Sequence, residues 1–182
     1  MATGEIRLII GPMFSGKTTE LVRLIRRFMI SGRKCIIIKH CSDSRYTEGD
    51  LEAIYTHDKI SMKALSSDNL LSLVSTLDEF EIIGIDEGQF FEDIAEFSEI
   101  MANKGKIIIV AALNGDFKRD LFGNIFKLLP LSESITSLTA ICSVCNNEAS
   151  FSKRITDDKD VKIIGGKETY TAICRKCFFK YV

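Results

Sequence analysis

The stretch that decides the fold is Gly11-Pro12-Met13-Phe14-Ser15-Gly16-Lys17-Thr18. It matches the phosphate-binding pattern G-x-x-x-x-G-K-[ST] at every fixed position. The glycines let the backbone curl so that N–H groups face phosphate oxygens, Lys17 reaches the β- and γ-phosphates, and the Thr18 hydroxyl can bind Mg²⁺. An apolar run at 8–10 precedes the loop, and apolar residues at helical spacing follow it over 18–31. This order of strand, loop and helix favours a nucleotide-binding P-loop over a chance match, so all eight residues are candidate cofactor-binding residues.

Apolar runs alternate with helical patterns as far as Leu113. The pattern predicts further strands at 35–38, 82–85 and 107–113, and helices at 68–80, with Asp68 as N-cap, and 91–104. The strands are continuous apolar runs, which is typical of a parallel sheet covered by helices on both faces. We therefore predict an α/β fold, with a RecA-like P-loop domain at 1–137 and a small zinc-ribbon-like module at 138–182.

Two acids follow the strand predicted at 82–85, namely Asp86 and Glu87. A P-loop enzyme needs an acid at the end of a neighbouring strand to hold Mg²⁺, and we assign this role to Asp86 together with Thr18. Glu87 can then point towards the phosphate acceptor, although both residues could also form a plain acidic turn. In an ATPase the glutamate would activate water, whereas in a kinase it would take a proton from an acceptor hydroxyl. The length of 182 residues favours a small-molecule kinase.

Four of the six cysteines form two Cys-x-x-Cys pairs, Cys142 with Cys145 and Cys174 with Cys177. The N-terminus lacks the pattern of a secretion signal, so paired thiols favour metal ligands over disulfides. Two such pairs can form a closed tetrahedral S₄ site, which predicts one structural Zn²⁺. A redox dithiol and unrelated free thiols are the alternatives. The gap of 28 residues between the pairs leaves room for a further loop.

The composition excludes several classes of protein. The net charge is −1, which argues against a general nucleic-acid binder. No apolar run approaches the ~18 residues of a transmembrane helix, so we expect no membrane segment. A zinc-ribbon-containing regulatory P-loop ATPase that acts on nucleic acid is the alternative to a small-molecule kinase.

Several segments together resemble the type II thymidine kinases, and the sequences of these segments are most similar to those of the poxvirus enzymes. The resemblance runs from about Ile6 to Phe179, nearly the whole chain. The segments are GPMFSGKT (11–18), DSRY (43–46), THD (56–58), DEGQFF (86–91), AALNG (111–115), KR (153–154), IGG (164–166) and CRKCF (174–178).

The resemblance implies a cytoplasmic enzyme that transfers the γ-phosphate of ATP to the 5′-hydroxyl of thymidine, with Glu87 as general base. It implies that Asp43, Arg45 and Gln89 join Asp86 in the phosphate and metal site. It also implies a homotetramer and feedback inhibition by dTTP. The implied nucleoside site comprises Met13, Phe90, Leu113, Phe117, Phe122 and Tyr170, with a loop of Val161, Lys162, Ile163, Ile164 and Gly165 that closes over the base.

The composition is compatible with such a site. A flat pyrimidine needs aromatic side chains as pocket walls, and the chain has twelve Phe and no Trp. Taken singly, any Phe is more often a core residue, and Gly165-Gly166 could be a plain hairpin turn. The chain departs from the family at Asn114 and Asp116, where Asp and Thr are usual, and at Asp120-Leu121, where Lys-Pro is usual. These changes add negative charge and remove a stiffening proline, so the sequence does not define the shape of this loop.

Overall fold

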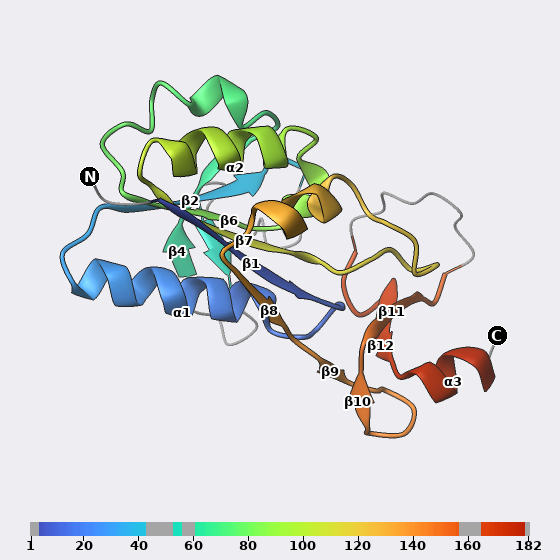
Figure 1. The fold of residues 1–182 in the computed structure, drawn as a ribbon. Helices are drawn as coiled ribbons and strands as arrows, with labels where there is room; N and C mark the ends of the chain where they lie inside the picture. Colours follow the sequence, from blue (N-terminus) through green and yellow to red (C-terminus); the bar gives the residue numbers. More distant parts are fainter. Residues whose placement is uncertain (1–3, 43–52, 56–60, 157–164, 181–182) are drawn as a thin grey trace.

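The centre of the protein is a six-stranded sheet in the order β5-β2-β6-β7-β1-β8, in which all five strand pairs are parallel. The computed structural model describes residues 4–42, 53–55, 61–156 and 165–180. Figure 1 shows helix α1 on one side of the sheet and α2 on the other.

The sheet strands are β1 (Glu5–Gly11), β2 (Cys35–His40), β5 (Leu65–Ser67), β6 (Ile82–Ile85), β7 (Ile107–Leu113) and β8 (Ser134–Ser137). The helices are α1 (Lys17–Ile30), α2 (Ile94–Asn103) and α3 (Arg175–Lys180), with short 3₁₀ helices η1 (Leu71–Leu73), η2 (Gly88–Phe90) and η3 (Ile125–Leu131). Small antiparallel pairs are formed by β3 (Ala53–Tyr55) with β4 (Ser61–Lys63), β9 (Ala140–Ile141) with β10 (Glu148–Ala149), and β11 (Phe151–Arg154) with β12 (Tyr170–Ile173).

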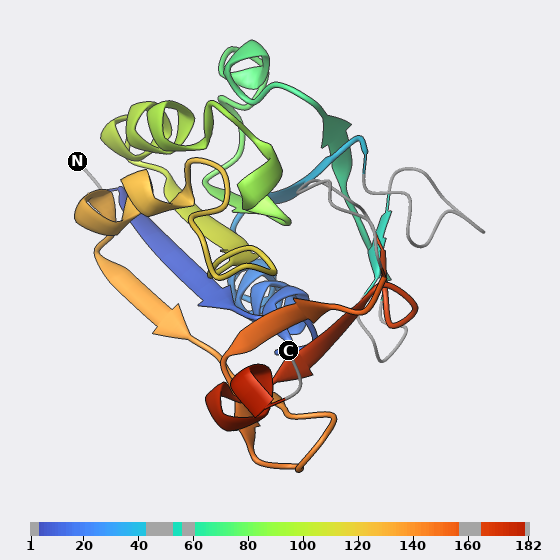
Figure 2. The same cartoon turned by 90° about the vertical axis from the view of Figure 1, so that its right-hand side faces the viewer.

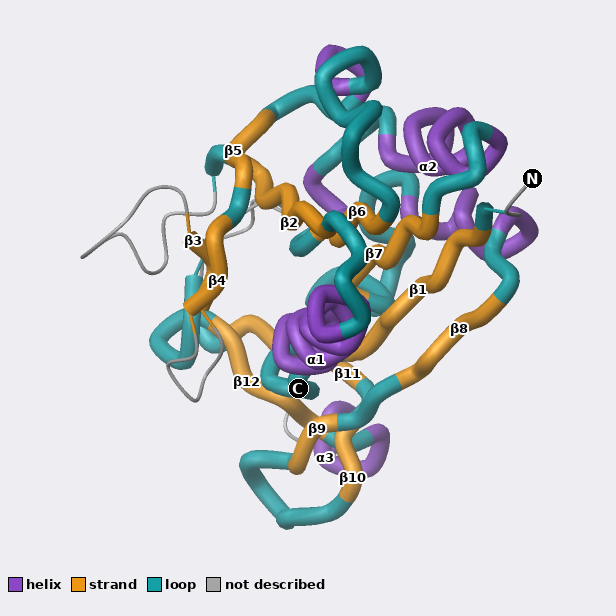
Figure 3. Tube along the Cα trace, turned by 90° about the vertical axis from the view of Figure 1, so that its left-hand side faces the viewer, coloured by secondary structure: helices purple, strands orange, loops and turns teal. Residues whose placement is uncertain are grey.

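Two apolar cores lie on opposite faces of the sheet, as expected for continuous apolar strands covered by helices. Figure 3 shows the helices on these faces, α1 on one side of the sheet and α2 on the other. On one face, Leu21, Val22 and Ile25 of α1 pack against the strands. On the other, Ile94, Phe97 and Met101 of α2 do the same. The predicted strands at 35–38, 82–85 and 107–113 and the helix at 18–31 are confirmed, with ends shifted by at most two residues. The predicted helix at 91–104 begins three residues later, after η2.

The sequence pattern does not predict the two edge strands of the sheet, β5 and β8. All four residues of β8 are exposed, and β5 is mostly exposed. Such short strands carry little apolar pattern, and they form because the neighbouring strands β1 and β2 present unpaired backbone groups.

The predicted helix at 68–80 is wrong, because this segment contains only η1 and a series of turns. Its polar side chains bind nearby backbone groups and so compete with helix formation. Asn69 Oδ1 accepts from the Ser72 N–H at 2.8 Å, and the Ser72 and Thr76 hydroxyls donate to carbonyls three residues earlier. Asp68 is therefore not the N-cap of a helix.

Residues 138–156 and 165–180 lie at the end of the sheet where β1 leads into the P-loop, as Figures 1 and 2 both show. Hydrogen bonds that hold them there include those from the Met13 N–H to Ser152 Oγ at 2.9 Å and from Asn114 Nδ2 to the Ser150 carbonyl at 3.1 Å. A separate cluster of buried apolar residues and cysteines forms inside this segment. Among the described residues, no helix is long and apolar enough to cross a membrane.

Candidate active site

The P-loop runs from the end of β1 into the first turn of α1, as predicted. Gly16 has φ 83°, a left-handed conformation that costs glycine little. A side chain at Gly11 would meet the Leu138 carbonyl oxygen at 2.8 Å, so the loop also needs glycine there. The Lys17 ammonium donates to the Pro12 carbonyl at 2.7 Å, inside the loop. The α1 N-terminus and the loop N–H groups together suit an anion.

Thr18 and Asp86 meet across the P-loop. The Thr18 hydroxyl lies 3.1 Å from each oxygen of the Asp86 carboxylate. Asp86 is nearly buried and sits directly after β6, where its N–H donates to the Ile38 carbonyl of β2 at 2.9 Å. A hydroxyl and a carboxylate are hard oxygen donors, which are the ligands that Mg²⁺ prefers. These two side chains therefore fit a magnesium ion bound with nucleotide phosphates.

Glu87 follows Asp86 and has φ 52° and ψ 42°, in the left-handed region that non-glycine residues seldom adopt. Such strain persists only where the surroundings hold it, and it concentrates at functional sites. Its carboxylate is buried and accepts from Gln89 Nε2 at 2.5 Å. Gln89 Oε1 in turn accepts from the Leu113 N–H at 3.0 Å. The turn thus gives Asp86 and Glu87 different surroundings.

The aromatic residues of the implied nucleoside site converge on one place. Met13, Leu113 and Tyr170 form a buried cluster, and Phe14, Phe117 and Phe122 pack against it. Phe90 meets Phe122 edge to face, with ring centroids 5.8 Å apart. The structure therefore brings together six of the described residues that the resemblance assigned to the nucleoside site, from segments far apart in the sequence.

Arg154 is a member of this site that the sequence reading did not identify. Its guanidinium lies 3.9 Å from the ring centroid of Phe117, and its Nη2 donates to the Tyr170 hydroxyl at 2.6 Å. Only 7% of the residue is exposed. Alternate residues of β11 are buried, so Ser152 and Arg154 face inward. A polar strand gives no apolar signal for this, and the signals that the sequence does contain are the family-like KR segment at 153–154 and the period of two in the strand.

The loop after β7, whose shape the sequence left open, is organised by Asp116. Asp116 Oδ1 accepts from the N–H groups of Lys118 and Asp120, both at 2.8 Å. The Asp116 N–H also donates to the Asp120 carbonyl at 3.0 Å. The residue that departs from the family pattern thus uses its carboxylate oxygen as an acceptor inside the loop. In this way the loop is closed without the usual proline.

Several predicted site residues lie outside the described residues, and their roles stay predictions. They are Asp43, Arg45, Val161, Lys162, Ile163 and Ile164. Gly165 is described and buried, and a side chain at this position would meet Thr169 Cβ at 2.6 Å.

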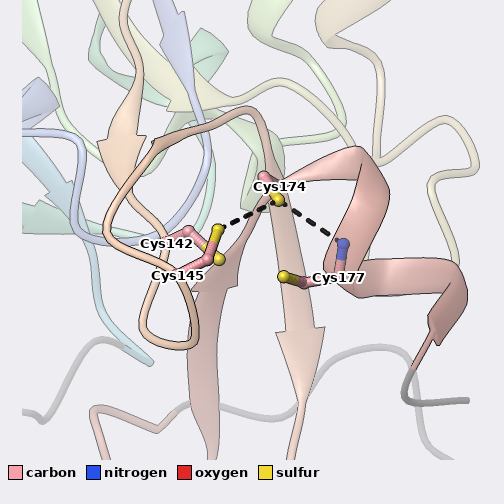
Figure 4. Close-up of side chains that lie close together, drawn as sticks. All are labelled: Cys142, Cys145, Cys174 and Cys177. Atoms are coloured by element: carbon pink, nitrogen blue, oxygen red, sulfur yellow. Dashed lines mark hydrogen bonds between the residues drawn. The ribbon is translucent and has the colours of Figure 1, made fainter.

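The four paired cysteines meet in one cluster, with all sulfur atoms within 4.8 Å of one another. Figure 4 shows them converging from the turn after β9 and from the end of β12 and α3. Cys145 Sγ lies 3.6 Å from Cys174 Sγ, and the Cys177 N–H points to Cys174 Sγ at 3.4 Å. In a tetrahedral zinc site with Zn–S bonds of ~2.3 Å, neighbouring sulfurs are ~3.8 Å apart. The cluster therefore fits one zinc ion with no open position.

The electrostatics of the cluster also favour a cation. Burial raises the pKa of the Cys142 thiol, but backbone hydrogen bonds at Cys174, Val144 and Cys145 outweigh it and lower the pKa to about 6. Burial and the three neighbouring cysteine sulfurs raise the pKa of Cys177 to about 12. Four thiolates cannot share this space without a compensating charge, which a divalent metal provides. Of the other cysteines, Cys35 is half-buried in β2 and Cys41 is exposed.

The fold and these sites define a class, a P-loop nucleotide-binding protein with a Mg²⁺-competent acid and a four-cysteine centre. A family model described as thymidine kinase matches residues 4–178. The chain is 64% identical over 181 residues to the thymidine kinase of fowlpox virus (strain NVSL), covering 98% of this chain and 99% of that protein. It is 52% identical to the thymidine kinases of sheeppox virus (strain KS-1) and vaccinia virus (strain Ankara), again over 98% of this chain and 99% and 98% of theirs. The chain belongs to the thymidine kinase family, which confirms the resemblance seen in its motifs.

Proposed function

We propose that this protein is an ATP-dependent thymidine kinase that phosphorylates the 5′-hydroxyl of thymidine to give dTMP. The observation that carries the proposal is the juxtaposition of three parts at one end of the sheet. These parts are the P-loop, the Asp86–Glu87 pair and the aromatic cluster around Met13 and Tyr170. A phosphate donor and a flat, apolar-faced acceptor would meet there beside two carboxylates.

The donor side of the reaction is assigned to the P-loop. Its N–H groups and Lys17 would bind the β- and γ-phosphates, with the α1 N-terminus directed at the anion. Thr18 and Asp86 would hold Mg²⁺, which neutralises developing charge on the phosphates when bound. Asp43 and Arg45 are proposed to complete this part of the site.

Glu87 is proposed as the general base. A 5′-hydroxyl is a weak nucleophile until its proton has an acceptor, and a carboxylate within hydrogen-bond reach both orients the oxygen and takes the proton. The Thr18 hydroxyl bonds to Asp86, and Glu87 bonds to Gln89 instead. This division supports one acid for the metal and one for the acceptor.

The nucleoside would lie among the aromatic residues described above. Arg154 supports this pocket, because one guanidinium contacts the face of Phe117 and binds the Tyr170 hydroxyl. Residues 161–165 are proposed to cover the base and to read it through main-chain groups. Gly165, at the described end of this loop, lies close to the Thr169 side chain, which leaves no space for a side chain at this position.

The remaining parts of the proposal concern the whole protein. We propose a P-loop domain at 1–137 and a zinc-binding module at 138–182, with zinc as a structural metal that shapes the base-covering loop. A homotetramer, inhibition by dTTP and a cytoplasmic location are implied by the family resemblance. They remain predictions.

A single assay separates this function from a regulatory ATPase. Purified protein with Mg·ATP is given either thymidine or single-stranded DNA, and ADP release is measured along with dTMP. The proposal predicts ADP release that requires thymidine and matches dTMP formation one to one. ADP release driven by DNA, with no dTMP, would support the ATPase instead.

A further inference from the structure

Gln89 is held in the protein interior next to the proposed base, with 1% of the residue exposed. One end of its amide donates to Glu87 Oε2 at 2.5 Å, and the other end accepts from the Leu113 N–H at 3.0 Å. An amide has distinct donor and acceptor ends, so the backbone N–H of β7 determines which end faces the carboxylate. The side chain is thus a fixed link between β7 and Glu87.

The backbone around Gln89 is also restrained on both sides. A side chain at Gly88 would meet Val110 Cγ1 at 2.6 Å, and Gly123 has φ 60° and packs tightly against the backbone of Gln89. Glu87 itself is held in a left-handed conformation. The segment therefore has little freedom to move, and the Gln89 amide meets Glu87 from a rigid platform.

We propose that Gln89 is a positioning residue that aims the Glu87 carboxylate, rather than a direct contact of the nucleotide as its place in the motif suggests. The inference rests on the proposed function, in which Glu87 accepts the proton of the thymidine 5′-hydroxyl. With Oε2 held by Gln89, the carboxylate is kept in one orientation. Losing the link would let the carboxylate rotate, and a misplacement of about 1 Å costs up to ~10²-fold in rate.

The test uses two substitutions with different structural cost. Gln89→Glu keeps the shape of the side chain and the acceptor for the Leu113 N–H, but it replaces the donor facing Glu87 with a carboxylate. Gln89→Met removes both polar ends at similar length. We expect each to lower the single-turnover rate of phosphoryl transfer roughly 10–100-fold, with KM for thymidine and for Mg·ATP within about threefold.

A double-mutant cycle shows whether Gln89 acts through Glu87. In a Glu87→Gln background the proton acceptor is already absent, so adding Gln89→Glu should change the residual rate by no more than about twofold. An equal loss in both backgrounds would overturn the inference, and so would wild-type rates in both Gln89 variants. A large rise in the KM for Mg·ATP would also overturn it, because that result indicates a nucleotide contact.

Two further measurements keep the outcomes distinct. Asn124→Ala removes a hydrogen bond at 2.5 Å to the Glu92 carbonyl, just after η2, without touching Glu87. It should leave the transfer rate within about twofold, and a loss equal to that of Gln89→Met would assign the effect to general loosening and overturn the inference. If the wild type does not phosphorylate thymidine, the proposed function itself fails. If Glu87→Gln keeps the full rate, the function stands, but the base role of Glu87 fails and the inference about Gln89 fails with it.

Discussion

Replacing Asp116 tests whether its carboxylate organises the loop that carries Phe117 and Phe122. Its Oδ1 accepts two backbone N–H bonds of 2.8 Å, and 7% of the residue is exposed. Asp116→Ala removes both bonds, whereas Asp116→Asn keeps an oxygen in the same place and removes only the charge. The two variants therefore separate the acceptor from the negative charge.

The magnitude follows from these two bonds. A hydrogen bond to a charged group contributes about 1.5–3 kcal/mol, but Lys118 and Asp120 are exposed, so their N–H groups can bind water in the variant. We therefore expect Asp116→Ala to lower the free energy of unfolding by about 2–3 kcal/mol, and Asp116→Asn by less than about 1 kcal/mol. For a chain of 182 residues the first value corresponds to a fall in melting temperature of roughly 4–12 °C.

Thermal and urea unfolding measure the stability, and thymidine KM reports the position of the two aromatic rings. Asp116→Ala should raise the KM several-fold with little change in kcat, because the loop contributes to binding rather than to the transfer step. Equal damage from Asn and Ala would show that the charge, not the acceptor geometry, matters. Unchanged stability in Asp116→Ala would refute the assigned role altogether.

Three further predictions concern the zinc cluster, the base-covering loop and the aromatic pocket. Purified protein should contain one zinc ion per chain, and Cys145→Ser should lower both the zinc content and the melting temperature. A zinc content well under one ion per chain, in wild-type protein prepared without chelator, would contradict a structural metal. Gly165→Val should raise thymidine KM at least tenfold, because the valine side chain would clash with Thr169. Gly166→Ala should change the KM little, because the added methyl group meets only the flexible end of the Glu168 side chain. Similar KM values in the two variants would exclude the steric explanation. Arg154→Met should raise thymidine KM roughly tenfold, because it removes a desolvated cation–π contact with Phe117 and a charged hydrogen bond. Arg175→Met should not raise the KM, because Arg175 is exposed and its cation–π contact is with Phe151. An unchanged KM in Arg154→Met would show that Arg154 is not part of the site.

Much of the fold follows from local patterns in the sequence. The strands β6 and β7 are continuous apolar runs bounded by polar residues, and their predicted ends agree with the structure. The P-loop pattern defined the end of β1 and the start of α1. The Cys-x-x-Cys spacing predicted a cluster that the structure brings together. In each case the residues whose pattern predicts the strand, loop or cluster are also the residues that form it.

Other features depend on contacts that no local pattern contains. The strand β8 forms because it lies beside β1, although its own four residues are exposed. The segment at 68–80 has apolar residues at helical spacing, but its serine, threonine and asparagine side chains bind the backbone instead. The link from Leu113 through Gln89 to Glu87 requires a left-handed residue after β6 and a neighbouring strand, so spacing alone could not predict it.

The central claim is that Glu87 accepts the proton of the thymidine 5′-hydroxyl while Asp86 and Thr18 hold the metal. The most direct test is the rate of phosphoryl transfer from ATP to thymidine in Glu87→Gln, measured beside equilibrium binding of Mg·ATP and thymidine. The account predicts a loss of roughly 10²–10⁴-fold in rate, with both binding constants within a few-fold and melting temperature nearly unchanged. A near-normal rate would contradict the role of Glu87 as base, and loss of Mg·ATP binding along with turnover would make Glu87 a metal ligand instead.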